Sequence, residues 1–575
     1  MLRRIFSYMK EYKKYAWLAL ICIGVEVVLE IMVPKLMADL IDIGVTNSDV
    51  PYIINKGIQM AVCAVAALIL GVGSARFSAL AGQGLGANIR KAEYEKLQSY
   101  SFSNIDHFSV SSLVTRLTSD VTNIQNAVST GMRPFGRSPV MLIFATTLAF
   151  QINSTLALVF LVALPVLAVM LIIIIINVGP RYGRMQGAVD LVNRCIEENL
   201  TAVRVVKSYV RGDYEIEKFR NVNDNLKNES EKAFGIAVLN MPAMQFVMYS
   251  TILGILLIGG RLINSGQMMI GQLTSFLSYV LLILNSLMMM SNVFLLMTRS
   301  LASAERIMKV IDEPIDITDE NAKDIEVKKG EIEFNHVWFK YNETAKEYVL
   351  SDVSFHINAG QTVGIIGQTG SSKTTLIQLI PRLYDASKAE IKIDGINVKE
   401  YPVRHLRDAI SVVLQKNTLF SGSLIDNLRW GDENATLDEI KEACSIACVD
   451  EFIDRLPGGL DAEMGQEGVN VSGGQKQRIC IARAILKKPK VLILDDSTSA
   501  VDTATEGKIK NALAKKLPDM TKIIIAQRIS SVCQADQIII MDGGRVDAIG
   551  THESLLRTNK IYQEIYESQK EGADL

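Results

Sequence analysis

The 575-residue sequence has no Cys-x-x-Cys pair and no marked excess of charge of either sign. Its seven cysteines are scattered. The nearest two, Cys444 and Cys448, have no second pair of ligands nearby, so we expect free thiols in a reducing compartment. With 60 basic and 62 acidic residues, the chain gives no support for a nucleic-acid partner. No cleavable signal peptide is apparent, because the basic start runs into an apolar stretch too long for one.

Hydrophobic residues make up 49% of the chain and gather in long runs before about residue 300. The mean hydropathy of +0.21 indicates that a large part of the chain lies in lipid. Six runs approach the roughly 20 residues needed to cross a bilayer. They are 16–42, 53–80, 134–152, 154–178, 236–261 and 270–298. Helical apolar spacing continues beyond four of them, which predicts helices that stand clear of the membrane over 81–104, 110–133, 180–206 and 214–235.

The basic residues predict the orientation of these spans. The segments 43–52, 152–154 and 262–269 contain no Lys or Arg, whereas the N-terminal tail and the regions 81–133 and 180–235 are rich in both. Because cytoplasmic loops carry the excess of Lys and Arg, we expect both termini and the two long regions to be cytoplasmic. The sequence therefore predicts a multi-pass protein of the plasma membrane.

After an acidic, polar segment over 301–330, the chain alternates between strands and helices. The string VGIIGQTGSSKTTL (363–376) reads as a strand, a glycine-rich loop and a helix start, and it nearly fits the P-loop pattern. Gly367 and Gly370 allow backbone N–H groups to turn inward around an anion. Lys373 can reach the β- and γ-phosphates of a nucleotide, and the Thr374 hydroxyl can bind Mg²⁺.

A second string, KVLILDDSTSAVD (490–502), is a buried strand that ends in two carboxylates. Asp495 is placed to hold Mg²⁺, as in phosphoryl-transfer sites. Asp496 follows at the position of a general base. Between the two strings lies NVSGGQKQR (470–478). Its VSGGQ resembles the signature motif of ABC transporters, which is usually LSGGQ.

Together these motifs make the chain similar to an exporter-type ABC half-transporter along its whole length. The resemblance implies an all-α transmembrane domain of six helices (1–310), a linker (311–330) and a cytosolic α/β nucleotide-binding domain of the P-loop type (331–575). It implies ATP and Mg²⁺ as cofactors, the lipid bilayer as surroundings and a second half-transporter as partner. A soluble ABC ATPase is excluded by the six spans.

The resemblance also implies the site residues. Nucleotide contacts fall on Tyr341, Gly367, Gln368, Thr369, Gly370, Ser371, Ser372, Lys373, Thr374, Thr375, Gln415 and Asp502. Mg²⁺ falls on Thr374, Gln415 and Asp495. The signature residues Ser472, Gly473, Gly474 and Gln475 are expected to contact ATP held by the partner subunit. GQEG (465–468) stands where exporters carry an acidic VGExG segment, with Gln466 in place of the acid.

Three residues depart from the family pattern at the nucleotide site. Asp496 replaces the catalytic glutamate and is one methylene shorter, and a misplacement of about 1 Å can cost on the order of 10²-fold in rate. Gln527 replaces the switch histidine, and Ser372 replaces the last P-loop glycine. Such changes occur in degenerate ATP sites, so we expect this chain to be the degenerate-site subunit of a heterodimer. The alternative is a homodimer with two slow sites.

The membrane half offers candidates for a substrate site. Glu26 and Glu30 lie four residues apart, and ionisable groups at membrane depth are expensive, so they are expected to line a cavity that favours cations or to face a polar seam. Gln245, Tyr249 and Met289 lie in methionine-rich spans that suit a promiscuous apolar pocket, although methionine also fills gaps or faces lipid. The segments 109–118 and 208–217 resemble coupling helices.

These observations predict ATP-driven export of hydrophobic or amphipathic, drug-like molecules. Lipid or peptide export uses the same fold. A peptidase domain ahead of the first span, which peptide exporters often carry, is not apparent. An ATP-gated channel or regulatory subunit is the alternative from another class, and the long regulatory insertion expected of it is also not apparent.

Overall fold

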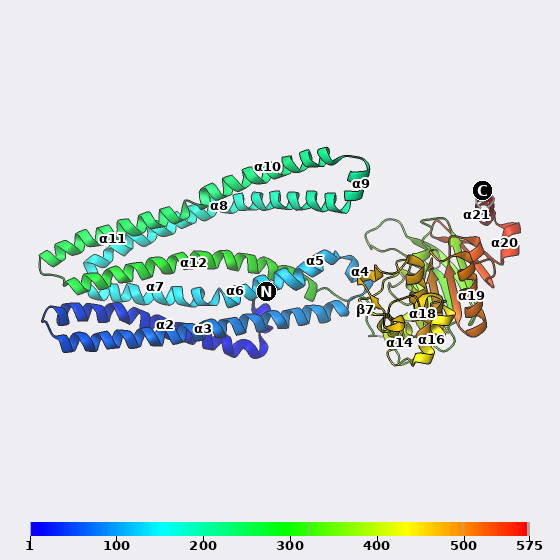
Figure 1. Cartoon of the computed structure of the whole chain (residues 1–575), viewed down its shortest axis with the longest axis horizontal. Coiled ribbons are helices and arrows are strands. Elements are labelled where there is room, and N and C mark those ends of the chain that lie inside the picture. The colour runs from blue at the N-terminus through cyan, green and yellow to red at the C-terminus, as the bar shows by residue number, and fades with distance from the viewer. Residues whose placement is uncertain (1, 321, 498–499, 572–575) are drawn as a thin grey trace. The chain divides into compact units, whose positions relative to one another are not determined.

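The computed structural model describes residues 2–320, 322–497 and 500–571 of the chain (Figure 1). The chain divides into two compact units. The helical unit comprises Met1–Gln98 and Val110–Glu313, and the α/β unit comprises Ser99–Ser109 and Pro314–Leu575. The short segment Ser99–Ser109, from the first half of the sequence, is therefore part of the α/β unit.

The helical unit is built from long helices joined by tight turns. Its longer helices are α2 (Lys13–Asp39), α3 (Val50–Gln98), α7 (Met132–Ile152), α8 (Ser154–Thr201), α10 (Gly212–Ala237), α11 (Asn240–Asn264) and α12 (Ile270–Ile311). The shorter ones are α1 (Leu2–Ser7), α5 (Val110–Thr115), α6 (Val121–Ser129) and α9 (Val203–Ser208). Single turns of other helical types occupy Lys10–Tyr12, Leu40–Val45 and Arg116–Asp120.

Several helices are longer than a bilayer is thick. Helix α3 has 49 residues and extends about 74 Å, against roughly 30 Å of hydrocarbon. The predicted continuation of the second span as helix is thus confirmed as far as Gln98. Among the described residues, five helical segments are long and apolar enough to cross a membrane, and α8 carries a shorter apolar stretch, Ser154–Leu167, within the fourth predicted span.

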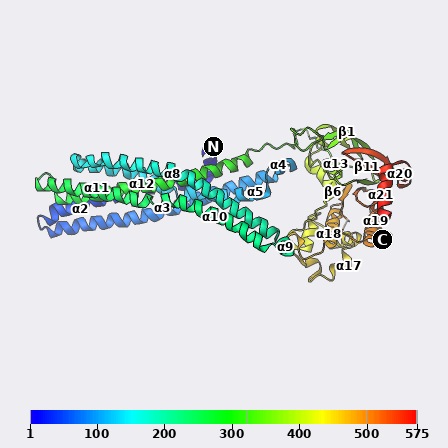
Figure 2. The same ribbon diagram turned by 90° about the horizontal axis from the view of Figure 1, so that it is seen from above.

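The helical unit buries one set of apolar side chains and exposes another. Helix α2 packs on α3, α7 and α12, and α8 lies alongside α10 and α11. The neighbouring helices α8 and α10 are labelled in Figure 2, which gives the view from above. Phe160 and Tyr279 are fully enclosed, whereas Leu68 is 67% exposed on α3. Large exposed apolar side chains on a helix of this length are expected where lipid is the solvent.

The α/β unit contains two larger sheets. The strands are β1 (Ile332–Phe339), β2 (Leu350–Ile357), β3 (Thr362–Gly367), β4 (Lys388–Ile393), β5 (Ile396–Asn397), β6 (Ile410–Val413), β7 (Gly422–Ser423), β8 (Glu463–Met464), β9 (Val491–Asp495), β10 (Thr521–Ile525), β11 (Gln537–Asp542) and β12 (Arg545–Gly550). One sheet has the order β2-β1-β4-β5 and the other β12-β11-β3-β10-β9-β6. In the second sheet, β11, β3, β10, β9 and β6 run parallel and β12 is antiparallel.

Helices surround these sheets. They are α13 (Lys373–Leu379), α14 (Val403–Asp408), α15 (Leu424–Arg429), α16 (Leu437–Ile446), α17 (Asp450–Ile453), α18 (Gly473–Leu486), α19 (Thr503–Lys516), α20 (His552–Thr558) and α21 (Lys560–Glu571). Strands β9 and β10 are buried along their whole length, which explains why VLIL in β9 and III in β10 are continuous apolar runs rather than alternating patterns.

The segment Ser99–Ser109 contains the short helix α4 (Phe102–Asp106). Asp106 accepts a 2.7 Å hydrogen bond from the Tyr384 hydroxyl, and the Phe102 ring lies 6.0 Å from the Tyr384 ring. The Asn104 amide donates to the Pro314 carbonyl at 2.8 Å. Helix α4, which contacts Tyr384, thus lies just ahead of the segment 109–118, for which the sequence suggested a coupling helix. The second suggested turn does interrupt the helices, since residues 209–211 separate α9 from α10.

The end of the linker is fixed to the α/β unit by one carboxylate. Asp394, in the turn between β4 and β5, accepts hydrogen bonds from the backbone N–H groups of four consecutive residues at 2.7–3.0 Å. These residues are Lys328, Lys329, Gly330 and Glu331. The linker therefore enters β1 along a defined path.

Candidate functional site

The candidate site lies at one edge of the large sheet. Parallel strands end at the same edge, and open α/β sheets bind ligands there. The P-loop follows β3, Asp495 ends β9, Gln415 follows β6 and Gln527 follows β10. The sheet order places β10 between β3 and β9, with β6 next to β9. Segments that are up to 160 residues apart in the sequence are thus gathered by topology alone.

The P-loop passes from β3 to α13 through a tight turn. Gly370 has a φ of 87°, which a residue with a side chain rarely adopts, and a Cβ on Gly367 would lie 2.2 Å from the Met541 carbonyl oxygen. Lys373 Nζ donates to the Gly367 and Gln368 carbonyls at 2.9 and 2.8 Å and to Ser371 Oγ at 3.2 Å. Burial lowers the pKa of Lys373, so the free ammonium favours an anionic partner.

Ser372 occupies the left-handed region, with φ 69° and ψ 23°, at the N-cap of α13. Its side chain forms no capping hydrogen bond there. A left-handed residue with a Cβ costs about 1–2 kcal/mol, which glycine avoids. The glycine usual at this position is therefore explained by backbone geometry, in addition to the close approach of phosphate that the sequence suggested.

Thr374 and Asp495 form a fitting site for a divalent cation. Thr374 Oγ1 donates to Asp495 Oδ1 at 3.2 Å, which joins the P-loop to β9. The other carboxylate oxygen, Asp495 Oδ2, is buried without a hydrogen-bond partner. Burial raises the pKa of Asp495, because the charged form lacks solvation there. A hydroxyl and an orphaned carboxylate oxygen at one point are the hard oxygen ligands that Mg²⁺ prefers.

Asp496 is paired with the residue at the switch position. Gln527 Nε2 donates to Asp496 Oδ2 at 3.0 Å, and the Gln415 side chain also hydrogen-bonds to Asp496. Burial raises the pKa of Asp496, while these two hydrogen bonds act in the opposite direction. Asp496 has a φ of 46°, another strained position for a residue with a side chain. The structure thus brings together Asp496 and Gln527, two of the residues that depart from the family pattern, with the Gln415 side chain.

Tyr341 lies just beyond the end of β1 and is 48% exposed. Its hydroxyl is 2.9 Å from Thr375 Oγ1 and donates to Gln378 Oε1 at 3.3 Å, so the ring is held beside the first turns of α13. An exposed aromatic face next to the P-loop helix is suited to stacking on a base. The side chains of Gln368 and Thr369 are exposed on the same loop.

The signature residues start helix α18. Ser472 is its N-cap, where Ser472 Oγ accepts from the Gln475 N–H at 3.3 Å and Gln475 Oε1 accepts from the Ser472 N–H at 2.9 Å. This capping box leaves Ser472 and Gly473 exposed at the end of a 14-residue helix. A Cβ on Gly474 would lie 2.7 Å from the Ala500 carbonyl oxygen. The helix N-terminus therefore presents an open surface for an anion.

Asp502 caps helix α19, since its Oδ1 accepts from the Thr505 N–H at 3.0 Å. This backbone hydrogen bond lowers the pKa of Asp502. Residues 499–502, which resemble the D-loop of ABC transporters, therefore end in a helix cap, and Ser499 lies outside the described residues.

Residues 16–287 match the family described as the ABC transporter transmembrane region, and residues 350–499 match the one described as ABC transporter. An uncharacterised ABC transporter ATP-binding protein of Bacillus subtilis, YfiB, is 37% identical over 575 residues, covering all of both chains. This chain belongs to the ABC transporter family. A lipid A-core flippase of Pseudomonas putida is 32% identical over 98% of this chain and 95% of its own.

The fold of this ABC transporter is that of solved exporters. The structure of a bacterial Atm1-family ABC exporter with ATP bound superimposes with a TM-score of 0.83 and 22% identity, over 98% of each chain. The predicted fold class, a helical membrane domain with an α/β P-loop domain, is confirmed. The chain is an ABC exporter half, embedded in a membrane, and an ATP-binding ATPase coupled to transport.

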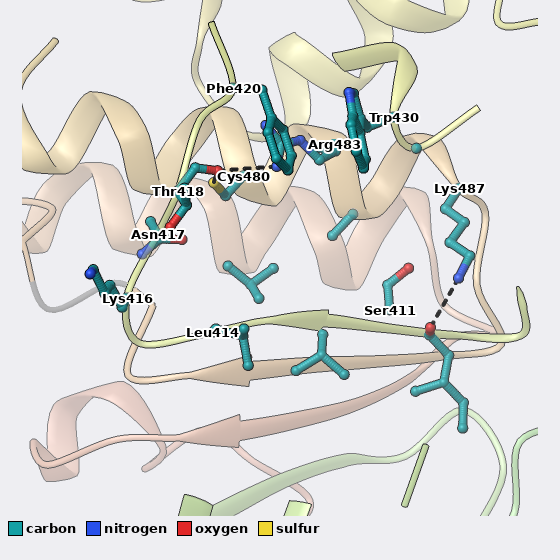
Figure 3. A pocket seen from close by; sticks show the side chains of 15 residues that line it. Ser411, Leu414, Lys416, Asn417, Thr418, Phe420, Trp430, Cys480, Arg483 and Lys487 are labelled. Carbon is teal, nitrogen blue, oxygen red and sulfur yellow. Dashed lines mark hydrogen bonds between the residues drawn. The ribbon is translucent and has the colours of Figure 1, made fainter. Parts of the chain in front are cut away.

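The transporter has a cavity of about 340 Å³ beside this site, which the sequence did not reveal (Figure 3). It lies between β6, the loop after Gln415 and helix α18. Phe420 stacks on Trp430 at 4.1 Å, and Arg483 bonds to Asn427 and to the Thr418 carbonyl. The cavity connects the Gln415 loop with the helix that carries the signature residues.

The predicted substrate residues of the transporter do not form one site. Gln245 lines a cavity of about 170 Å³ with Leu167, Leu284, Asn285 and the methionines Met241, Met244, Met248 and Met288. Tyr249 and Met289 are 62% and 42% exposed and are not among the described residues that line it. Glu26 and Glu30 lie elsewhere and are paired with Arg133 and Arg137. The sequence signal for this pairing is that Arg133 and Arg137 have the same four-residue spacing as Glu26 and Glu30.

Proposed function

We propose that this transporter exports hydrophobic or amphipathic small molecules across the bacterial plasma membrane, as the degenerate-site subunit of a heterodimer. The observation that carries the proposal is the hydrogen bond from Gln527 to Asp496. Support for an amphipathic substrate comes from the related Pseudomonas putida protein, which is named as a lipid A-core flippase. We also propose, as the sequence predicts, that both termini are cytoplasmic. The membrane domain would end near residue 310, and the nucleotide-binding domain would begin near residue 331.

The pairing of Asp496 with Gln527 makes a poor hydrolytic centre. A general base must reach the attacking water, and efficiency depends on its geometry and pKa. Here the Gln527 amide donates a hydrogen bond to one carboxylate oxygen of Asp496. This bond holds the carboxylate back from the attacking water, which the shorter aspartate side chain already reaches less well than a glutamate would. An amide also cannot gain or lose a proton near neutral pH, as the imidazole usual at position 527 can. ATP would therefore be held here and hydrolysed slowly.

Apart from Ser372, the residues expected to hold nucleotide match the family pattern. Lys373 and the P-loop N–H groups would bind the phosphates, and Tyr341 would stack on the base. The orphaned Asp495 Oδ2 with Thr374 and Gln415 would hold Mg²⁺, which when bound neutralises phosphate charge. The exposed Ser472 and Gly473 would complete the competent site on the partner. Binding of two nucleotides would then close the α/β units, and hydrolysis at the partner's site would reset them.

The test is the ATPase activity of the purified full chain in nanodiscs, alone and with a half-transporter that carries Glu and His at the two positions. Alone, the chain should bind a fluorescent ATP analogue but turn over well below about 1 s⁻¹, the low end for ordinary enzymes. Together, the pair should hydrolyse ATP and accumulate amphipathic dyes in inside-out vesicles. Fast turnover by the chain alone would show that it is not a degenerate-site subunit.

A further inference from the structure

Four charged side chains form an alternating series between helices α2 and α7, which we call the charge ladder: Arg133, Glu26, Arg137 and Glu30. Arg133 Nη2 lies 2.6 Å from Glu26 Oε1. Arg137 reaches Glu26 at 3.3 Å and Glu30 at 2.6 Å. Each helix contributes two residues four positions apart, so each presents both charges on one face.

The ladder is buried unevenly. The side chain of Glu26 is 6% exposed and that of Arg137 is 19% exposed. At the ends, Glu30 is 33% exposed and Arg133 is 42% exposed. The two accessible groups are thus one anion and one cation, separated by an enclosed pair that neutralises itself. Two buried carboxylate oxygens, Glu26 Oε2 and Glu30 Oε2, have no hydrogen-bond partner.

These side chains line a cavity of about 490 Å³, within the range of small-molecule sites. The other lining residues belong to α3 and are Ala64, Ala67, Leu68, Gly71, Val72 and Ala75. A Cβ on Gly71 would lie 3.3 Å from both Glu26 Oε1 and Arg133 Nη2, so the absence of a side chain lets α3 approach the ladder. The cavity therefore has one wall of charges and one of small apolar groups.

Charge balance limits what this cavity can hold. Two carboxylates and two guanidiniums sum to zero when all are ionised. At membrane depth, a ligand with a single charge would leave one elementary charge uncompensated in a medium of low dielectric constant, which is costly. A ligand that carries both an ammonium and an anionic group adds no net charge. It can place its ammonium on Glu30 and its anion on Arg133, with its hydrocarbon against α3.

We propose that the charge ladder and its cavity bind zwitterionic amphiphiles, with an ammonium and a phosphate in the headgroup, as the substrates of this exporter. The inference rests on the proposed export of amphipathic molecules and names their chemical class. Glu30 and Arg133 contact the headgroup, and Arg137 holds both carboxylates in place. This differs from the preference for simple cations that Glu26 and Glu30 alone would give.

Photo-cross-linking of the full chain in phosphatidylglycerol nanodiscs, without ATP, tests the binding. Three probes share a dodecyl chain with a diazirine near the headgroup and carry phosphocholine, trimethylammonium or phosphate. The phosphocholine probe should label the α3 peptide that contains residues 64–75 about tenfold more than the other two, the factor for one lost charge-assisted contact. Equal labelling by all three, or preference for the cation, would overturn the proposal.

Variants separate binding from folding. Gly71→Leu fills the cavity and should reduce phosphocholine labelling about tenfold, whereas Gly57→Leu, on the same helix with no atom within 4 Å of its Cβ, should not. Glu30→Gln should shift the preference toward the phosphate probe, and Arg133→Gln toward the trimethylammonium probe. A general loss of labelling without a change in preference would mean that the ladder has only a structural role.

The outcome is independent of the proposed function. Labelling requires neither hydrolysis nor a partner subunit. If labelling is selective but no amphiphile is transported by the heterodimer, the export proposal fails and the binding site stands. If amphipathic dyes are transported but labelling is not selective, the zwitterion site fails and the export proposal stands.

Discussion

The edge of the large sheet that carries Lys373, Asp495 and Asp496, which we call the nucleotide edge, and the charge ladder both bury charged groups. The surroundings of the charges differ between the two sites. At the nucleotide edge, Asp495 is hydrogen-bonded to Thr374 and Asp496 to Gln527, and the charges of Lys373 and Arg528 act on these carboxylates through space. At the ladder, two carboxylates meet two guanidiniums and the sum is zero. The first cluster also keeps Asp495 Oδ2 unpartnered where Thr374 adds a second oxygen ligand. A carboxylate oxygen left open beside a second oxygen ligand favours a cation from outside, and a closed series of ion pairs favours a ligand without net charge.

The difference is also one of origin. The nucleotide edge is assembled by strands that end side by side, and each of its residues follows a strand or starts a helix. The ladder depends on how α2 and α7 are rotated about their axes, because each must turn its charged face toward the other. The hydrogen-bonded residues are 107 and 111 positions apart in the sequence. Topology fixes the first set through the backbone, whereas the second set depends on side-chain packing.

The largest expected effect is on the ladder. Arg137→Ala leaves Glu30 without a partner, and breaking such a pair by removing one member costs about 3 kcal/mol, the low end for buried pairs because Arg137 is 19% exposed. Thermal unfolding in detergent should show the loss. Adding Glu30→Gln should restore most of it, and Ala at the exposed Arg76 should have little effect. An unchanged melting temperature for Arg137→Ala would mean that the ladder's charges do not depend on one another.

The next effect is at the nucleotide edge. The double variant Asp496→Glu and Gln527→His supplies the missing methylene and removes the amide that binds Asp496. ATPase turnover of the chain alone should rise about 10²-fold, the cost of roughly 1 Å of misplacement. Gln527→His alone is the control and should raise turnover much less. No gain in the double variant would place the defect elsewhere, for instance at Ser372.

A smaller effect is the pH dependence of Mg²⁺ binding. Burial raises the pKa of Asp495, so the free protein keeps this proton to a higher pH than an ordinary aspartate does. The protonated form stabilises the free protein at low pH, and this contribution is lost as the pH rises through the raised pKa. Because Mg²⁺ requires the carboxylate, its affinity should rise with pH over that window by at most about tenfold per unit, then level off.

Calorimetric titration of MgATP against pH measures this dependence, with ATP in the presence of a chelator as the control for the nucleotide's own titration. A flat MgATP profile after this correction would contradict a role for Asp495 as a metal ligand.

The smallest effect is at Ser372. Ser372→Gly removes a Cβ from a left-handed residue and should stabilise the P-loop by about 1 kcal/mol, seen as tighter ATP binding. Ser371→Gly, at the neighbouring position without a positive φ, is the matched control and should not stabilise the loop. Weaker ATP binding by Ser372→Gly would indicate that the serine hydroxyl itself contacts nucleotide.

The fold class was predictable from the sequence because its signals are local. The string VGIIGQTGSSKTTL contains a strand, a loop and a helix start, and the apolar run in VLILD predicts a buried strand. The roles given to Tyr341, Gln415 and Ser472–Gln475 came from resemblance and stay predictions. The pairing of Glu26 with Arg133 was not predictable in the same way, because periodicity shows that residues share a face but not which helix that face meets. Helix α4 was missed since Phe102–Asp106 is too short to show a period.

The four N–H groups gathered by Asp394 have a practical consequence for any attempt to produce the α/β unit alone. A polypeptide starting at Glu331 would lack the amides of Lys328, Lys329 and Gly330, and the Asp394 carboxylate would face solvent with most of its partners gone. Strand β1 (Ile332–Phe339) would then begin from an unanchored end. An isolated fragment intended to bind nucleotide as the intact chain does should therefore begin upstream of Lys328.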